Sequence, residues 1–116
     1  MVANLVQPSD TDLLFRALGD ATRRDIVATV LVREQSVSAL ARRYPMSVAA
    51  VQKHVGVLER AGLVTRRRHG REQLVSGDVV ALRRARAALD GLEELWRGRM
   101  DRIGDLLTDP DTGEQR

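Results

Sequence analysis

The chain has 116 residues, of which 43% are hydrophobic and 30% are charged, and its formal net charge is +3. This length fits one domain with a modest core. The absence of cysteine excludes disulfides, thiol redox switches and thiolate metal sites. There is no N-terminal apolar run and no long apolar stretch, so we expect a soluble, cytoplasmic protein with no membrane contact.

The positive charge is concentrated in the middle of the chain. Residues 21–71 hold eleven basic and three acidic side chains, a net charge of +8, whereas residues 1–20 carry −2 and residues 72–116 carry −3. A basic block favours a polyanionic partner, because each neutralised phosphate releases counterions. A solvated arginine-rich surface explains the charge equally well, so charge alone does not decide between the two.

Two short helices are predicted to follow a flexible tail over residues 1–9. The first covers residues 12–18, and the second, capped by Asp20, covers residues 21–32. The residues expected to face inward are Leu14, Phe15, Leu18, Ile26, Val27 and Val30.

A third helix is predicted to begin at Ser36 or Ser38, with Leu40 and Ala41 inward. It is expected to run to about Tyr44, because Pro45 disfavours helical backbone in the residue before it. A short turn then leads into the fourth helix.

The fourth helix, between Ser47 and Gly62, has both of its ends marked. Ser47 can cap the N-terminus, and Gly62 stands where a left-handed residue usually follows a helix. At 100° per residue, one face must be buried and holds Val48, Val51, Val55 and Leu58. The residues of the opposite face and its flanks are Ala49, Lys53, Gly56, Arg60, Gln52 and His54. This second face is open to a partner because it includes two very small residues.

A β-hairpin is predicted next, with LVTRRR and REQLVS flanking a two-residue turn at His69 and Gly70. The turn sets a register that pairs Arg68 with Arg71, Arg67 with Glu72, Arg66 with Gln73, and Val64 with Val75. One face then carries Arg66, Arg68 and Arg71, and the other places Leu74 inward. Like charges directly opposite one another are destabilising, so the pattern favours a phosphate backbone over a merely solvated hairpin tip.

A long helix of about 45 Å is predicted over residues 78–107. Arg99 interrupts its heptad spacing and Met100 partly restores it. The apolar residues that recur at this spacing are Leu82, Leu89, Trp96 and Ile103, with Ala85, Leu92 and Leu106 between them. The helix is longer than this domain needs, so we expect a symmetric dimer along the seam, with packing on the chain's own first helix as the alternative. Residues 108–116 are expected to form a flexible tail.

This order of elements is mainly α with a small β-hairpin, and it is that of a winged helix-turn-helix, with the hairpin as the wing. Residues 10–107 are expected to form the DNA-binding and dimerisation domain. The segments LFRALGDATRRDIV, VSALARRYPMSVAAVQKHVGVLERAGLV and RRRHGREQLV occupy residues 14–27, 37–64 and 66–75. They resemble the ArsR (ArsR/SmtB-type) family of bacterial dimeric transcriptional repressors.

The resemblance implies a homodimer that joins through its first and last helices and inserts its fourth helix into the major groove of a palindromic operator. The residues expected at the dimer interface are Leu14, Leu82, Leu89, Leu92, Trp96 and Ile103. The residues expected to meet DNA are Arg42, Arg43, Ser47, Ala49, Ala50, Gln52, Lys53, His54, Arg66, Arg68, His69 and Arg71.

The side-chain chemistry of the fourth helix agrees with this implication. Gln52 can pair with adenine, Lys53 with guanine, and Ala49 can touch a thymine methyl group. Ser47 can serve both as a helix cap and as a phosphate contact. His54 fits either a DNA contact or a structural hydrogen bond. For Arg23 and Arg24, at the start of the second helix, an intramolecular salt bridge is favoured.

Neither a metal nor another cofactor is expected. The cysteine motif of the metal-sensing family members would fall near residues 38–43, where there is no thiol, and the only histidines are His54 and His69. The carboxylates of the last helix could bind a metal only weakly. We therefore expect a regulator of its own or a neighbouring operon that does not respond to metal, with an effector that is unknown or absent.

Two other classes of protein are alternatives to a DNA-binding regulator. No catalytic arrangement or phosphate-binding loop stands out, so we do not expect an enzyme. A protein-interaction adaptor on the same scaffold is the second alternative, and it predicts weak salt dependence and no sequence preference.

Overall fold

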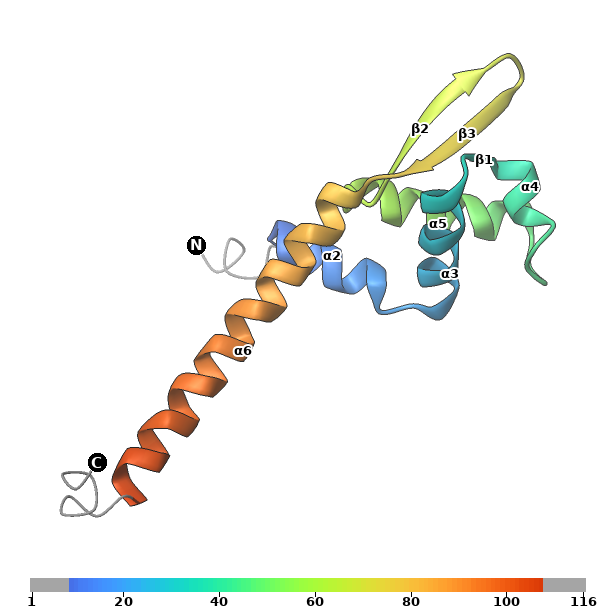
Figure 1. The fold of residues 1–116 in the computed structure, drawn as a ribbon. Helices are drawn as coiled ribbons and strands as arrows, with labels where there is room; N and C mark the ends of the chain where they lie inside the picture. Colours follow the sequence, from blue (N-terminus) through green and yellow to red (C-terminus); the bar gives the residue numbers. More distant parts are fainter. Residues whose placement is uncertain (1–8, 108–116) are drawn as a thin grey trace, which may run out of the picture. The chain divides into compact units, whose positions relative to one another are not determined.

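The computed structural model describes residues 9–107, so residues 1–8 of the first predicted tail and all of the second, residues 108–116, lie outside the described residues. The described part contains five α-helices and three β-strands (Figure 1). In chain order they are α2 (Asp10–Leu18), α3 (Ala21–Val32), β1 (Gln35–Ser36), α4 (Val37–Ala41), α5 (Val48–Arg60), β2 (Val64–His69), β3 (Glu72–Gly77) and α6 (Val79–Leu107). All five predicted helices and the hairpin are present, and β1 is an addition.

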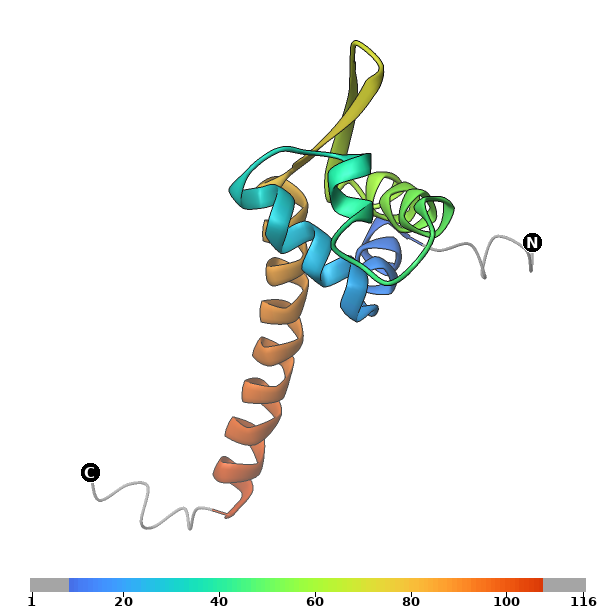
Figure 2. The same ribbon diagram turned by 90° about the vertical axis from the view of Figure 1, so that its right-hand side faces the viewer.

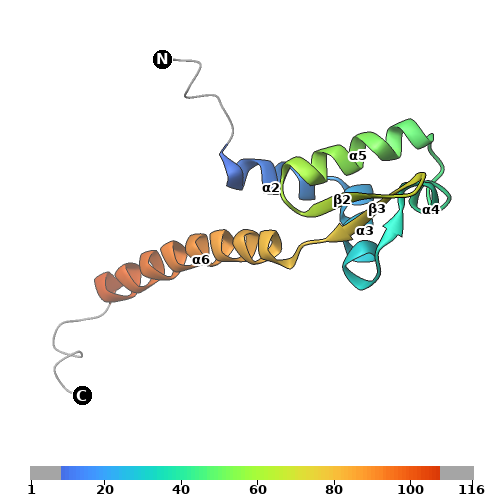
Figure 3. The same ribbon diagram turned by 90° about the horizontal axis from the view of Figure 1, so that it is seen from above.

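The chain divides into two compact units after Ala85. The first contains the core, in which α5 lies beside α2 and α3 (Figures 2 and 3). Its largest fully buried side chains are Leu14, Ile26, Leu40, Val51, Val55, Leu58, Leu63, Val64 and Val75. The second unit begins at Arg86, and its described part is the remainder of α6.

Side-chain caps fix the helix starts. Asp20 accepts a hydrogen bond from the backbone N–H of Arg23, and Ser47 accepts one from that of Ala50, as expected for N-caps. Ser36, not Ser38, caps α4. Ser9 caps α2 in a reciprocal pair with Asp12, so this helix begins before the predicted residue.

The prediction that α4 extends to about Tyr44 was wrong, since α4 ends at Ala41. The backbone N–H of Arg43 bonds the carbonyl of Leu40 at 2.9 Å, which tightens the chain into a turn before Pro45 is reached. Proline restricts the residue that precedes it, but here the helix stops earlier than that restriction requires.

The predicted hairpin register was also wrong. The two-residue loop is Gly70–Arg71, one position later than predicted, because glycine takes the first loop position with a φ of +64°. Arg68 therefore lies opposite Gln73 rather than Arg71, and Arg67 opposite Leu74 rather than Glu72. The observed partners of Val64 and Arg66 are Gly77 and Val75. In this register no two arginines of β2 and β3 lie opposite each other. The argument that a bound anion must offset facing arginines therefore fails.

Each β2 residue therefore pairs with a β3 residue two positions later than predicted. A shift of two residues leaves the same side chains on each face of the hairpin. Arg66 and Arg68 share the face that also holds the buried Val75. Leu74 lies on the opposite face, as predicted, but it is only partly buried, so the buried face is the one that holds Val75. In the backbone ladder, Leu74 pairs with Ser36 of β1. The sheet order is β1-β3-β2, so the short β1 covers one edge of the hairpin.

Candidate nucleic-acid interface

One side of α5 is buried in the core and the other is open. Val51, Val55 and Leu58 are 0% exposed, whereas Gln52 and Lys53 are exposed. Gly62 adopts the predicted left-handed conformation after the helix, with a φ of +79°. The sequence thus predicted this helix, its two ends and most of its buried face.

Val48 and Gly56 depart from that prediction. Val48 was predicted to lie on the core face but is 53% exposed, because it is the first residue of α5, one turn before the buried Val51. Gly56 was assigned to the open face but is buried, and Arg60 lies close above it: a Cβ on Gly56 would stand 3.6 Å from the Arg60 guanidinium. The open face is therefore wider at the start of α5, where Val48 joins Ser47, Ala49 and Gln52.

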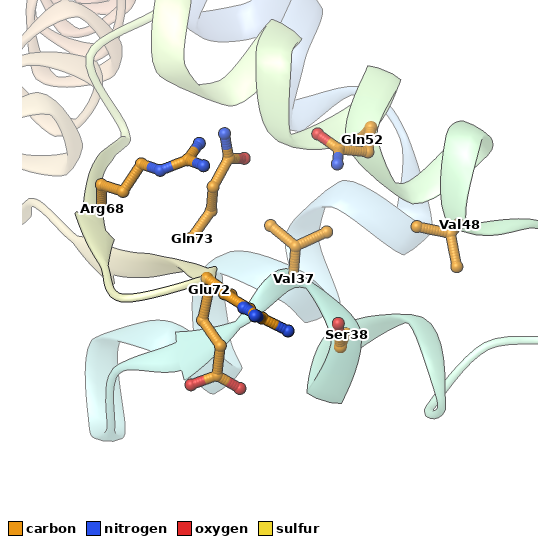
Figure 4. A pocket seen from close by; sticks show the side chains of 8 residues that line it. Val37, Ser38, Val48, Gln52, Arg68, Glu72 and Gln73 are labelled. Atoms are coloured by element: carbon orange, nitrogen blue, oxygen red, sulfur yellow. The ribbon is translucent and has the colours of Figure 1, made fainter.

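A cleft separates the start of α5 from the hairpin (Figure 4). Figure 4 shows the side chains of Arg68 and Gln73 beside each other and pointing towards α5, while Gln52 points from α5 towards the hairpin. The Oε1 atom of Gln73 is buried and has no hydrogen-bond partner within residues 9–107. The complete lining is Val37, Ser38, Val48, Gln52, Arg68, Arg71, Glu72 and Gln73. The structure thus brings together three of the residues predicted to contact DNA, Gln52, Arg68 and Arg71.

The guanidinium of Arg66 is occupied within the chain. Its Nε and Nη2 atoms donate to Glu59 Oε1 at 3.1 and 2.8 Å, and its Nη1 donates to Gln52 Oε1 at 3.2 Å. The Arg66 side chain is 24% exposed. The expected phosphate contact would require these bonds to break, so Arg66 differs in this respect from Arg68 and Arg71.

Arg67 forms an ion pair with Glu34 rather than with Glu72. Its guanidinium lies 3.0 Å from Glu34 Oε1, and the Ser76 hydroxyl donates to the other carboxylate oxygen at 2.6 Å. The Ser76 hydroxyl, followed by Arg67, lowers the pKa of the Glu34 carboxyl below its ordinary value. No local sequence pattern predicts this pair, because Glu34 and Arg67 are 33 residues apart.

His54 is partly buried, with a side-chain exposure of 21%. Its Nδ1 lies 3.3 Å from Arg23 Nη1 and 3.9 Å from Asp20 Oδ2. A guanidinium can only donate, so the shorter contact requires Nδ1 to accept, with the ring proton on Nε2. The ring also lies near the Asp20 carboxylate, with which it forms an ion pair only when it is protonated. The structural hydrogen bond weighed for His54 is therefore present.

The two arginines at the start of α3 bond backbone carbonyls rather than carboxylates. Arg23 donates to the carbonyls of Ala17 and Arg16 at 2.8 and 3.0 Å, and Arg24 donates to that of Leu18 at 2.7 Å. Carbonyls at a helix C-terminus lack partners within the helix, so these bonds cap α2. Within residues 9–107 neither arginine forms the expected salt bridge. The backbone N–H of Arg23 also lowers the pKa of the Asp20 carboxyl.

The turn between α4 and α5 is tied to α3 through Asp25. The Tyr44 hydroxyl donates to its carboxylate at 2.6 Å, and Arg43 lies 3.8 Å from the same oxygen. Burial, followed by the bond to Asp25, raises the pKa of Tyr44. Arg43 is therefore partly neutralised. The predicted DNA-contacting cations that are exposed and form no ion pair within the described part are Arg42, Lys53, Arg68 and Arg71.

Comparison with known proteins identifies this arrangement. Residues 18–67 match a family model described as a helix-turn-helix domain. The chain is 38% identical over 71 residues to YuzN of Bacillus subtilis, an uncharacterized HTH-type transcriptional regulator, covering 55% of this chain and 77% of that protein. It is also 38% identical over 79 residues to the HTH-type transcriptional regulator Rv2034 of Mycobacterium tuberculosis, covering 68% and 74%.

Among solved structures, an ArsR-like transcriptional regulator from Rhodococcus sp. RHA1 matches with a TM-score of 0.75 and 30% identity, covering 86% of this chain and 94% of that one. The chain belongs to the ArsR family of helix-turn-helix transcriptional regulators. As an ArsR-family protein it is a DNA-binding regulator with a winged helix-turn-helix fold, in which α4 and α5 form the helix-turn-helix and β2 and β3 the wing. The family is not a class of enzyme.

The residues of this ArsR-family chain that were predicted to form a dimer interface fall into two groups. Leu14 is 1% exposed and belongs to the core of its own chain, so the expectation that it faces a partner was wrong. Leu82 packs partly against the same core. The four members of the second group are exposed: Leu89 (54%), Leu92 (62%), Trp96 (61%) and Ile103 (39%). Within residues 9–107, no helix is long and apolar enough to span a membrane.

Proposed function

We propose that this ArsR-family regulator is a homodimeric repressor of its own or a neighbouring operon. Each protomer would insert α5 into the major groove of one half of a palindromic operator. The two half-sites would lie about 34 to 36 Å apart, one turn of the duplex, because a two-fold dimer presents two equivalent helices. The observation that carries this proposal is the exposed Lys53 beside Gln52 on α5, flanked by the free cations of the wing.

Some residues of the open face and the wing would contact DNA bases, and others would contact the DNA phosphates. Lys53 would donate to guanine, and Gln52 would read a neighbouring base. Val48 and Ala49 would offer methyl groups to thymine. Arg68 and Arg71 would hold phosphates, which position the protein without reading sequence. The contacts proposed as weaker or secondary are those of Arg42, Arg43, Ser47, Ala50, His54 and His69.

The dimer would form along the part of α6 that belongs to the second unit. Leu89, Leu92, Trp96 and Ile103 keep a heptad spacing and all are exposed, which is the pattern of a helix that pairs with a second copy. Arg97, one residue beyond the seam, forms ion pairs with Glu93 and Glu94 at 3.1 and 3.0 Å on its own helix. These ion pairs lie outside the proposed seam, which Arg99 interrupts.

We propose that the regulator does not respond to metal. The sequence offers no thiolate, and only two imidazoles. The Nδ1 of His54 is already bonded to Arg23, and His69 lies on the wing. The remaining donors are carboxylates, which bind transition metals poorly without nitrogen or sulfur ligands.

The test begins with DNA selected by the full-length protein from a random-sequence pool. Lys53→Ala should weaken binding to the selected DNA by about 1 to 3 kcal/mol and blur the preference at one base pair. Arg68→Ala should instead weaken binding to selected and scrambled duplexes alike and reduce the salt slope by about one. Arg86→Ala, which removes one positive charge at the start of the second unit, is the control for net charge.

Two results would contradict the proposal. If Lys53→Ala and Arg68→Ala bound the selected DNA as tightly as the unmodified protein, α5 and the wing would not be the DNA-contacting surface. If the protein selected no sequence and bound DNA independently of salt, a protein-interaction adaptor would explain the scaffold better.

A further inference from the structure

We propose that Glu59 and Arg66 form a clamp that fixes the side-chain amide of Gln52 for base reading. Arg66 is then a positioning residue that sets specificity, and it makes no phosphate contact. The inference rests on the proposed function, in which α5 reads DNA, and adds to it a device that links the wing strand β2 to the reading helix.

The geometry of the clamp is that of a chain of charge-assisted bonds. Glu59 Oε1 accepts from two nitrogens of Arg66, at 3.1 and 2.8 Å, and the third nitrogen of Arg66 reaches Gln52 Oε1 at 3.2 Å. Bonds between a guanidinium and a carboxylate are stronger and more directional than neutral ones. The Arg66 side chain is 24% exposed and Glu59 42%, so water screens the pair only in part.

The clamp determines which end of the Gln52 amide faces outward. Amide oxygen and nitrogen are hard to tell apart by shape, but a guanidinium carries only donors. The atom that faces Arg66 must therefore be the oxygen. The Nε2 group is left to donate to a base edge, while the second lone pair of Oε1 can still accept a bond.

The clamp also removes a positive charge from the DNA-contacting surface. Glu59 neutralises Arg66, whereas Arg68, two residues along the same face of β2, forms no ion pair within the described part. Two arginines on one strand face thus have different roles. Arg68 is free for a phosphate, and Arg66 holds a reading residue in place, which reduces the conformational entropy lost by Gln52 on binding.

The first experiment identifies the base pair of the selected DNA at which the Gln52→Ala protein no longer prefers one base over the others. Arg66→Met should lower discrimination at that same base pair by about tenfold, the scale of one good base contact, and leave the salt slope unchanged. The double variant Gln52→Ala with Arg66→Met should lose no more than either single change, because both remove the same interaction.

Glu59→Gln separates positioning from charge. Releasing Arg66 should lower discrimination at the Gln52 base pair and also steepen the salt slope by about one, as the freed guanidinium finds a phosphate. Asp90→Asn is the control, because it also removes one negative charge, on α6 outside the cleft, where Asp90 is exposed and forms no ion pair among the described residues. It should leave discrimination at that base pair intact.

The free protein offers a readout that does not depend on DNA. The side-chain amide of Gln52 should be ordered by ¹⁵N relaxation in the full chain and become mobile in Glu59→Gln. Equal mobility in both proteins would overturn the clamp even if a variant folded poorly. An Arg66→Met protein that kept its discrimination but lost about one unit of salt slope would show a phosphate contact instead. An unmodified protein without any base preference would overturn the proposed function itself.

Discussion

Glu34 joins parts of the chain that are far apart in sequence. It precedes β1, yet its carboxylate accepts bonds from Arg67 of β2 and Ser76 of β3. Both donors stabilise the charged form, and this lowers the pKa of the carboxyl group. The residue therefore holds the base of the wing against the chain that follows α3, and it does so only while it is ionised.

Glu34→Gln tests this role through its dependence on pH. A carboxyl whose pKa is lower in the folded chain stabilises the fold above its unfolded-state pKa, here near 4.5, and that contribution is lost as the pH falls through the folded value. The variant should unfold at a lower urea concentration than the parent at pH 7, and the gap should close in acid. Ser76→Ala, which removes the hydroxyl that donates to Glu34, should also unfold at a lower urea concentration than the parent at pH 7. A gap of constant size from pH 7 to pH 3 would contradict this assignment.

At the level of elements, Gly77 marks the tight approach of β3 to α3. A Cβ at this position would stand 2.6 and 2.7 Å from the Leu31 side chain and 3.0 Å from its Cα. Gly77→Ala should destabilise the fold by about 1 to 3 kcal/mol, the range for overpacking. Gly91→Ala is the matched control, since its Cβ would meet no described atom within 4 Å, and it should stabilise α6 by up to about 1 kcal/mol.

Urea unfolding of the three proteins at one protein concentration measures both effects. Destabilisation by Gly91→Ala of the same size as by Gly77→Ala would mean that steric contact with Leu31 is not the cause. The comparison also shows whether β3 is held against α3 as closely as these distances indicate.

The same elements show what the sequence could and could not predict. Local signals were sufficient for α3 and α5, where Asp20, Ser47 and Gly62 mark the ends. The hairpin was predicted but its register was not, because either residue beside Gly70 could complete a two-residue loop. The two-residue β1 carries too few residues for a periodic signal.

The contacts within the candidate site were the least predictable. That α5 has an open face follows from helical periodicity alone. The bonds from Arg66 to Glu59 and Gln52 depend on how β2 crosses α5, which no local pattern encodes. For the same reason a DNA contact and a structural hydrogen bond were both left open for His54, and its partner Arg23 was not predicted.

At the level of the whole molecule, the two units carry different kinds of surface. The free cations at Lys53, Arg68 and Arg71 all belong to the first unit, in agreement with the net charge of +8 over residues 21–71. The second unit exposes large apolar side chains at heptad spacing, among them Leu89, Trp96 and Ile103. In the proposed function, the first surface contacts DNA and the second forms the dimer that repeats this contact across a two-fold axis.

Trp96→Glu tests the second surface. Trp96 is 61% exposed at the middle of the proposed seam, between Leu89 and Ile103, and a carboxylate there would face its own copy across the two-fold axis. The unmodified chain should sediment as a dimer at micromolar concentration and the variant as a monomer. Gly91→Glu adds the same charge to the same helix away from the seam and should remain dimeric. A parent chain that is already monomeric would leave α6 without its proposed partner, and one α5 helix reading a single half-site would then have to supply all of the operator affinity.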